Sequence, residues 1–350
     1  MIALEEKQMK AAVFFGKHDV RVQEVQELAL GVKDVRIKIA YCGVCGTDIH
    51  IYEGDPGAAP VTPPNILGHE MSGVVVETGK DVTQVKAGDR VAVDPNEMCG
   101  QCFYCRNAMG HFCTQMTGYG TTARGGFAEF LTVPEKQVYK IPDHMPLEHA
   151  ALSETVSCCV HGIDLCKIHA GQTVLVIGAG PIGLIMLQLA KLQGAAYMIV
   201  SEPTEQKREL ALKLGADRAV DPTCEDLKSI LAGYPNVDCV IECVGSVKTM
   251  AQAVAVAGRG ATVMFFGLTP PGAEIAIKPY EVFAKELHIT ASFINPYTFT
   301  RAISLLAEEK INVRDIISLE LKLDDILRVF EEPACRQGGK VLINMGSEGN

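Results

Sequence analysis

Four cysteines stand in one short glycine-containing loop with the spacing C-x2-C-x2-C-x7-C; they are Cys99, Cys102, Cys105 and Cys113. This spacing lets four thiolates converge on one tetrahedral zinc and leaves no coordination position open. A closed site of this kind stabilises a loop and does not catalyse. Four cysteines could also form disulfides or hold an iron–sulfur cluster, but the spacing and the neighbouring motifs favour structural zinc.

A second concentration of metal-binding residue types lies nearer the N-terminus, in the runs Cys45 to His50 (Cys-Gly-Thr-Asp-Ile-His) and Gly68 to Glu70 (Gly-His-Glu). A catalytic zinc needs about three protein ligands and one open position for water or substrate. Cys45, His69 and a carboxylate would supply such a set. Cys42 forms a CxxC pair with Cys45, so a redox dithiol is the competing hypothesis, although no thioredoxin-like pattern follows the pair.

The third candidate site is a glycine-rich turn that directly follows an apolar run and opens a helical pattern. Its glycines allow a tight turn and let a pyrophosphate approach the N-terminus of the helix. The predicted cofactor contacts in this turn are Gly178, Gly180, Pro181, Ile182 and Gly183. The plainer alternative is a turn that serves packing alone.

Glu202 stands 24 residues beyond Gly178, at the end of the next apolar run. An acidic side chain at this position accepts hydrogen bonds from the adenosine ribose hydroxyls and repels a 2′-phosphate. The sequence therefore favours NAD over NADP as cofactor, unless Glu202 is only a solvated loop residue. Lys207, which we also expect near the cofactor, and its neighbour Arg208 keep some use of NADP possible.

Two kinds of secondary structure are expected to position these groups. The first 160 residues contain short alternating runs such as Val20–Val25 and Val35–Ile39, which predict many short strands in a curled, mostly antiparallel sheet. From about Gly171 solid apolar runs alternate with helical patterns, as expected of a doubly wound parallel sheet. The solid runs are 174–177, 197–200, 237–243, 261–266 and 287–293, and they make a six-stranded nucleotide domain plausible.

The C-terminal tail combines an amphipathic helix with a final strand. Apolar residues at Phe299, Ala302, Ile303 and Leu306 follow a helical period, and Lys340–Asn344 resembles a strand. This tail is too short to fold alone, so it should return to the first domain. We therefore predict an α/β protein in which residues 1–160 and 295–350 form the catalytic domain and residues 161–294 form a Rossmann domain.

Composition narrows the class of protein. A chain of 350 residues is long enough for two cores. The net charge of −10 argues against nucleic acid or an anionic membrane as the main partner. The stretch from Met1 to Gln8 lacks the apolar core of a secretory signal, and glycines and a proline interrupt the most apolar stretch, 174–190. We therefore expect a cytoplasmic protein, in which clustered cysteines are metal ligands rather than disulfides.

Together these motifs resemble the zinc-dependent medium-chain alcohol dehydrogenases, in the branch that holds the sorbitol, arabitol, threonine and butanediol dehydrogenases. The resemblance covers nearly the whole chain and includes Gly88-Asp-Arg-Val91 and Gly125-Gly-Phe-Ala-Glu129 besides the three candidate sites. It implies an N-terminal GroES-like fold, like the small chaperonin ring subunit, and a homo-oligomer, either a tetramer or a dimer.

The resemblance also assigns roles. It implies that Cys45 and His69 bind a catalytic zinc, with Glu70 or Glu154 as the remaining carboxylate, directly or through water. Thr47 and His50 would relay the substrate proton to the surface; an ordinary loop histidine is the plainer alternative for His50. By resemblance, Asp48 would support the metal ligands and Lys340 would reach the cofactor pyrophosphate.

The expected reaction is hydride transfer from a secondary alcohol to NAD, aided by a zinc that polarises the alcohol oxygen. The segments 266–268 and 292–297 are most similar to sugar-alcohol dehydrogenases, which favours a sorbitol, xylitol or arabitol type of polyol, or its phosphate, as substrate. Threonine or 2,3-butanediol would suit the same machinery. A metal-free reductase or a lens-type structural protein would not explain the retained metal-ligand motifs. A non-catalytic zinc and NAD module is the remote alternative, which the intact Thr47, His50 and Glu70 disfavour.

Overall fold

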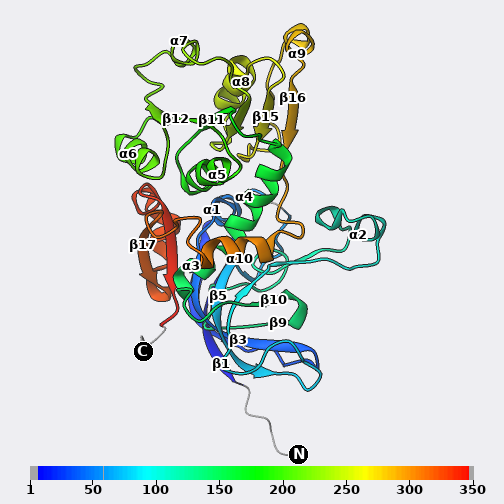
Figure 1. The fold of residues 1–350 in the computed structure, drawn as a ribbon. Helices are drawn as coiled ribbons and strands as arrows, with labels where there is room; N and C mark the ends of the chain where they lie inside the picture. Colours follow the sequence, from blue (N-terminus) through cyan, green and yellow to red (C-terminus); the bar gives the residue numbers. More distant parts are fainter. Residues whose placement is uncertain (1–6, 58, 347–350) are drawn as a thin grey trace, which may run out of the picture. The chain divides into compact units, whose positions relative to one another are not determined.

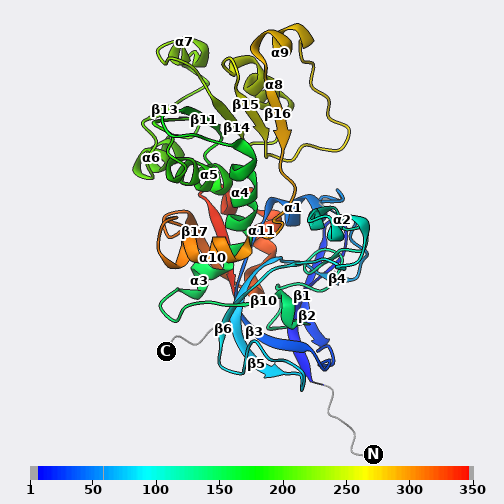
Figure 2. The same cartoon turned by 45° about the vertical axis from the view of Figure 1, so that its right-hand side comes forward.

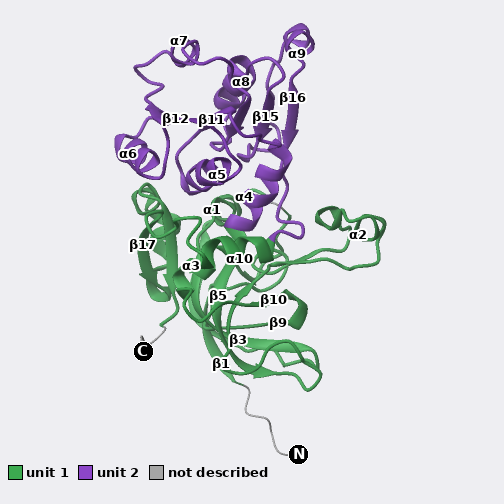
Figure 3. Cartoon of the chain, viewed as in Figure 1, with its two compact units in different colours: residues 1–155, 299–350 green, residues 156–298 purple. Residues whose placement is uncertain are grey.

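The computed structural model describes residues 7–57 and 59–346. The chain forms two compact units, residues 1–155 with 299–350 and residues 156–298 (Figure 3). The domain boundaries predicted from the sequence, near residues 160 and 295, lie a few residues from the boundaries of these units. The assignment of catalytic and cofactor domains to the two units remains a prediction. Most of the N-terminal stretch that argued against a secretory signal, residues 1–6, lies outside the described residues.

The first unit is built mainly from two sheets (Figure 1). The smaller one has the order β2-β1-β4 and consists of β1 (Gln8–Gly16), β2 (Asp19–Gln26) and β4 (Asn65–Ile66). The larger one has the order β10-β6-β5-β3-β18-β17, and β9 pairs with β3. Its strands are β3 (Asp34–Gly43), β5 (Glu70–Thr78), β6 (Arg90–Val93), β9 (Phe130–Pro134), β10 (Val138–Lys140), β17 (Ile317–Lys322) and β18 (Lys340–Asn344).

The alternating pattern of β3 explains the core of this unit. Val35, Ile37 and Ile39 are fully buried together with Phe127 and Leu131, while Lys38 between them is exposed. Successive side chains of a strand point to opposite faces, so one face of β3 supplies the core. The strands β3, β5, β6 and β10 pair in antiparallel fashion, as the sequence predicts.

The C-terminal tail does return to the first unit. Strand β18 pairs antiparallel with β3, with Ile343 opposite Cys42, and α10 (Phe299–Ala307) is the predicted amphipathic helix. Strand β17, which pairs in parallel with β18, was not anticipated. The remaining helices of the unit are α1 (Gly46–Tyr52), α2 (Phe103–Arg106), α3 (Leu147–Ala151) and α11 (Leu327–Glu331).

The second unit contains a six-stranded sheet in the order β13-β12-β11-β14-β15-β16, and every neighbouring pair in it is parallel (Figure 2). The strands are β11 (Thr173–Ile177), β12 (Tyr197–Ser201), β13 (Arg218–Val220), β14 (Cys239–Glu242), β15 (Thr262–Phe265) and β16 (His288–Ala291). Central strands such as β11 are buried along their whole length, which explains their solid apolar sequence. The order is that of the doubly wound nucleotide-binding fold, and the predicted fold class is confirmed.

Helices connect these strands. They are α4 (Ser153–Cys166), which leads into the unit, α5 (Pro181–Leu192), α6 (Glu205–Lys213), α7 (Leu227–Leu231), α8 (Val247–Val256) and α9 (Pro279–Lys285). No helix in the described part of the chain is both long and apolar enough to span a membrane.

Candidate active site

The four-cysteine loop folds into a compact lobe around α2, formed by residues 99–113. The four sulfur atoms lie within 4.8 Å of one another. Backbone amides of the same loop donate to them: Cys102 N lies 3.4 Å from the Cys99 sulfur, and Cys105 N lies 3.5 Å from the Cys102 sulfur. Amide donors directed at sulfur stabilise thiolates.

The ionisation of these thiols shows that the lobe suits a cation. Amides of Cys105 and Thr114 lower the pKa of Cys102 to about 6. Burial and the neighbouring Cys102 raise the pKa of Cys105 to about 12. Four thiolates therefore cannot form together at neutral pH without a positive charge among them, and a tetrahedral zinc would supply that charge. The residues fit a structural zinc.

The second cluster joins two segments through the pairing of β3 with β5. Cys45 is the N-cap of α1 just after β3, and His69 immediately precedes β5. In the ladder Gly43 stands opposite Glu70. As a result the ligand atoms of Cys45, His69 and Glu70 lie within 4.8 Å of one another.

Asp48 supports this cluster from behind. Its Oδ2 accepts a hydrogen bond of 2.8 Å from the Cys45 amide, and its Oδ1 accepts one of 3.3 Å from the Gly68 amide. The same Oδ1 lies 3.6 Å from Nδ1 of His69. At this distance the carboxylate attracts the Nδ1 side of the ring without a hydrogen bond, which leaves Nε2 as the natural metal-binding nitrogen.

The charge around His69 also favours a cation. Burial lowers the pKa of His69, but Asp48 and the Cys45 sulfur raise it by more, so that the pKa lies well above its usual range. The site therefore stabilises positive charge among its own side chains. Together with one thiol, one imidazole and one carboxyl group, this fits a catalytic zinc with an open position.

Glu70 and Lys340 form a buried ion pair beside the ligands. The lysine Nζ donates to both carboxylate oxygens of Glu70, at 2.6 and 2.8 Å, and to the Val44 carbonyl oxygen at 3.2 Å. Glu70 is 0% exposed and Lys340 is 5% exposed. Burial lowers the pKa of Lys340, but the charges of Glu70, Cys45 and Glu154 and the hydrogen bond to Glu70 together raise it by more, so the lysine remains charged.

A glycine makes room for this pair. A Cβ at Gly43 would lie 2.0 Å from Oε2 of Glu70, so only glycine fits opposite the carboxylate. The family resemblance implied that Lys340 reaches the cofactor pyrophosphate; in the structure its amine has Glu70 and the Val44 carbonyl as partners. Contact of Lys340 with a pyrophosphate remains a prediction.

The second candidate carboxylate, Glu154, lies near the start of α4 and is 8% exposed. Its charge contributes to the raised pKa of Lys340, after the larger effects of burial and Glu70. Among the described residues, however, the group of ligand atoms within 4.8 Å contains Glu70 and does not contain Glu154. The structure thus brings the first of the two predicted carboxylates to Cys45 and His69.

Thr47 and His50 lie on α1 at different distances from the cluster. The Cys45 thiol is 3.7 Å from the Thr47 hydroxyl oxygen. The His50 side chain is 38% exposed, and its Nδ1 lies 3.7 Å from Asp55. A hydroxyl at the cluster and an imidazole near solvent fit the two ends of a proton relay.

Cys42 does not behave as a redox partner of Cys45. Its side chain is fully buried, and burial raises the pKa of its thiol well above the usual range. Both cysteines are free thiols in the structure. A protonated, enclosed thiol is a poor nucleophile, so the dithiol hypothesis loses its support.

The glycine turn of the second unit lies between β11 and α5. Gly178 has φ of 96°, a conformation that disfavours other residues, and a Cβ at Gly183 would lie 1.9 Å from the Gly178 carbonyl oxygen. A Cβ at Gly180 would meet no atom within 4 Å. Pro181 occupies the first turn of α5, and Ile182 follows it. The turn therefore presents an open backbone face at a helix N-terminus, which suits a pyrophosphate.

Glu202 follows β12 and is 6% exposed. Its two oxygens accept hydrogen bonds from the amides of Ala179 (2.9 Å) and Thr204 (3.0 Å). The carboxylate thus fixes the glycine turn, a role that the sequence did not indicate. Arg208 donates to the carbonyl oxygens of Glu202 and Pro203, and Lys207 precedes it on α6.

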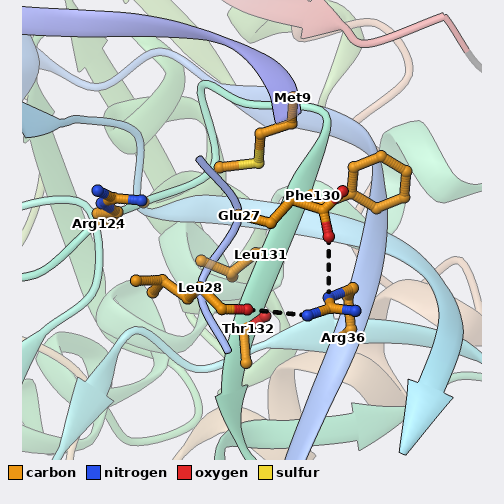
Figure 4. Close-up of a pocket in the computed structure, with 9 residues that line it drawn as sticks. Met9, Glu27, Leu28, Arg36, Arg124, Phe130, Leu131 and Thr132 are labelled. Carbon is orange, nitrogen blue, oxygen red and sulfur yellow. Dashed lines mark hydrogen bonds and ion pairs between the residues drawn. The ribbon is translucent and has the colours of Figure 1, made fainter. Parts of the chain in front are cut away.

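The lining of a pocket in the first unit includes none of the predicted site residues (Figure 4). It is lined by Met9, Glu27, Leu28, Arg36, Arg124, Gly125, Phe130, Leu131 and Thr132. The Arg36 guanidinium is already engaged by Glu77, by Glu27 at 3.3 Å and by the Leu28 carbonyl oxygen at 2.8 Å. We therefore regard this pocket as a packing feature of the β-sheets.

Comparison with known proteins agrees with the geometry. Residues 31–143 match the alcohol dehydrogenase GroES-like domain, and residues 181–308 match the zinc-binding dehydrogenase family. A D-arabinitol dehydrogenase of Uromyces fabae is 32% identical, with 96% of this chain and 97% of that protein covered. The chain belongs to the zinc-dependent medium-chain alcohol dehydrogenase family.

Two further relatives of this dehydrogenase are informative. An L-threonine 3-dehydrogenase of Thermococcus kodakarensis is 35% identical, with 89% of this chain and 91% of that protein covered. A zinc-binding dehydrogenase of Sinorhizobium meliloti 1021, solved bound to NADP, is 38% identical with a TM-score of 0.93; 97% of this chain and 99% of that chain are covered. The predicted family and enzyme class are confirmed.

Proposed function

We propose that this dehydrogenase oxidises a secondary alcohol of a polyol, of the sorbitol, xylitol or arabitol type or its phosphate, to a ketose with NAD as hydride acceptor. The observation that carries the proposal is the group formed by half-buried Cys45 with buried His69 and Glu70, whose ligand atoms lie within 4.8 Å of one another. The similarity to a D-arabinitol dehydrogenase over 96% of the chain supports the substrate class.

In this proposal Cys45 and His69 hold a catalytic zinc, and Glu70 is the carboxylate nearest to it, with Glu154 as the alternative. When bound, the metal supplies a Lewis acid that polarises the alcohol oxygen. Asp48 keeps the His69 ring in position through its contact with Nδ1. Lys340 forms an ion pair with Glu70 and thereby balances the negative charge of this buried carboxylate.

The proton of the alcohol leaves through side chains of α1. The Thr47 hydroxyl, close to Cys45, accepts it and passes on its own proton. The partly exposed His50 then delivers the proton to water. Removal of the proton from the alcohol oxygen allows the hydride to leave the carbon that bears this oxygen for the nicotinamide ring, and a carbonyl group forms.

For the cofactor we propose NAD, with its pyrophosphate on the turn from Gly178 to Gly183 and its adenosine ribose near Glu202. The buried carboxylate of Glu202 would repel a 2′-phosphate. Since the relative from Sinorhizobium meliloti was solved with NADP, the preference for NAD over NADP has to be measured directly.

We further propose a cytoplasmic homo-oligomer, either a tetramer or a dimer. Strand β16 is an edge of its parallel sheet, and its residues are largely exposed. Tyr280 and Phe283 of the preceding α9 are 78% and 77% exposed. Parallel strands are normally covered on both faces, so this edge suits a second copy of the chain.

Threonine is the second candidate substrate, because a threonine dehydrogenase is 35% identical to this chain. The deciding experiment is metal analysis of the purified enzyme, followed by NAD and NADP reduction with sorbitol, xylitol, arabitol, arabitol phosphate, threonine and 2,3-butanediol. We expect about two zinc ions per chain and the highest kcat/KM with NAD and a polyol. If kcat/KM is higher with threonine than with any polyol, threonine is the substrate and the polyol assignment is wrong. Zinc-loaded enzyme that turns over none of these alcohols would refute the proposal.

A further inference from the structure

One buried carboxylate of the second unit has no role in the function proposed above. Glu242, the last residue of β14, is 0% exposed. Its Oε1 accepts hydrogen bonds from Val244 N (2.9 Å), Gly245 N (3.0 Å) and the Thr249 hydroxyl (2.8 Å). All three donors are neutral, and no Lys, Arg or His in residues 7–57 and 59–346 forms an ion pair with this side chain.

This arrangement leaves a fixed negative charge without a counter-charge. Buried carboxylates are usually paired with a cation, because neutral donors stabilise the charge without cancelling it. The effect of the charge reaches the adjoining loop. Burial raises the pKa of the Cys243 thiol, and Cys159 and Glu242 raise it further.

The strand order places this charge at the cofactor crevice. β14 is the neighbour of β11 in the middle of the sheet, where the strand order reverses, and dinucleotides bind outside the carboxyl ends of the strands at such a point. If the glycine turn after β11 and Glu202 after β12 take the adenosine half, as proposed above, the nicotinamide half faces the ends of β14 and β15.

Packing keeps the carboxylate in this place. A Cβ at Gly267, just after β15, would lie 2.2 Å from Gly245 N and 2.8 Å from Oε2 of Glu242. A Cβ at Gly178 would lie 2.7 Å from a Val244 methyl group. The loops that follow β11, β14 and β15 therefore pack against one another, with the Glu242 carboxylate held between the last two.

We propose that Glu242 is a positioning residue whose fixed negative charge favours the oxidised, positively charged nicotinamide ring over the neutral, reduced ring. The oxidised ring would bring the counter-charge that the protein lacks at this point. NAD+ would thereby be held more tightly before hydride transfer, and NADH would be released more readily after it.

The Glu242→Gln variant tests the proposal, because it keeps an acceptor oxygen for the three donors and removes the charge. We would measure the Kd of NAD+ and of NADH by titration calorimetry without any alcohol. If the ring lies roughly 10 Å from the carboxylate and the effective dielectric constant is about 20 to 40, the ratio of the Kd of NAD+ to the Kd of NADH should rise roughly fourfold to fifteenfold, through weaker NAD+ binding. An unchanged ratio, with both affinities weakened equally, would show a loop anchor only and overturn the proposal.

Two variants separate the charge from its surroundings. Glu225→Gln removes a charge from an exposed ion pair with Arg218, and the Kd ratio should stay at the wild-type value. Thr249→Val removes one donor to Glu242 and keeps its charge, so the ratio should remain within about twofold of wild type. A shift with Thr249→Val as large as that with Glu242→Gln would contradict the electrostatic explanation.

A third variant keeps the test decisive if Glu242→Gln does not fold. Val247→Lys places a positive charge on a residue of α8 that is 44% exposed, and the ratio should move in the same direction as with Glu242→Gln; an unchanged ratio would count against the proposal. Since no alcohol is present in these titrations, failure of the polyol assignment would leave the result intact.

Discussion

The two candidate metal centres of the first unit are built in opposite ways. The lobe takes all four ligands from residues 99–113, and amides of the same loop donate to their sulfurs. The cluster of Cys45, His69 and Glu70 joins two segments through strand pairing, and its carboxylate is held by Lys340, 270 residues away in sequence. One centre is local and partly exposed; the other depends on the whole sheet.

This difference in construction suits the cysteine lobe to a stabilising role and the cluster of Cys45, His69 and Glu70 to a catalytic one. The four thiolates of the lobe need a cation to neutralise their charge, and together they leave no coordination position open. The free energy of metal binding there stabilises the folded loop. The second centre contains balancing charges, Asp48 behind His69 and Lys340 behind Glu70. It is therefore organised before any metal binds, and it can leave a position open for substrate.

The largest expected effect on activity follows from Cys45→Ser. A hydroxyl is a much weaker zinc ligand than a thiolate, so zinc should fall from about two to about one per chain and kcat/KM by roughly a thousandfold or more. The midpoint of thermal unfolding should stay close to wild type, because the lobe is intact. Metal analysis, steady-state kinetics and calorimetry check the three statements.

Cys42→Ala is the matched control for this variant, since Cys42 is a buried thiol only three residues away. It should keep both zinc ions and most of the activity. Loss of one zinc ion with Cys42→Ala would show that Cys42 is itself a ligand and would break the contrast between the two centres.

Cys102→Ser should have the opposite pattern. Loss of the lobe zinc removes the charge that holds four thiols together, so the unfolding midpoint should fall by about 10 °C or more. The enzyme that remains folded should keep its KM for alcohol and its second zinc ion. An unchanged midpoint together with one lost zinc ion would show that the lobe does not stabilise the fold.

The sequence predicts best those features whose parts are close along the chain. The spacing of Cys99 to Cys113 and the turn at Gly178 to Gly183 are local patterns. In the structure the four sulfur atoms lie close together, and Gly178 adopts the positive φ of a tight turn. The parallel sheet was also predictable, because strands buried on both faces have solid apolar sequences. The alternating residues of β17, Ile317–Lys322, are also typical of a strand, although none was predicted there.

Partners that depend on long-range packing were not predictable in this way. Lys340 was expected at the pyrophosphate, and only the pairing of β18 with β3 places its amine beside Glu70. Glu242 lies in the predicted apolar run 237–243, and no role was predicted for it. Its burial depends on the approach of Gly267 from the next strand, which no local pattern shows.

The ion pair between Lys340 and Glu70 should matter mainly for stability. In Lys340→Met the Glu70 carboxylate remains buried without its cation, which costs about 3 to 5 kcal/mol when one partner of such a pair is removed. Denaturant unfolding in a Cys45→Ser background, where only the cysteine lobe should hold zinc, measures this loss. The double variant Lys340→Met with Glu70→Gln should recover about half of it, and a purely additive double-mutant cycle would show that the two side chains do not interact.

The same pair has a definite pH dependence. The folded pKa of Lys340 is raised above that of an unfolded lysine, so its contribution is complete below the unfolded pKa of about 10.4 and is lost as the pH rises through the folded value. Wild type should therefore lose stability above about pH 10 more steeply than the double variant. Parallel pH profiles of the two proteins would argue against a charged Lys340.

The smallest expected effect distinguishes the two candidate carboxylates. Glu70→Gln should weaken zinc binding at the Cys45 centre by about tenfold or more, whereas Glu154→Gln, outside the 4.8 Å group, should change it by less than about threefold. Competition with a chelator measures both affinities, and Cys102→Ser protein removes the contribution of the lobe from the titration. A larger effect of Glu154→Gln would reassign the carboxylate to α4. The active centre would then draw its ligands from three separate elements, which would widen its contrast with the local cysteine lobe.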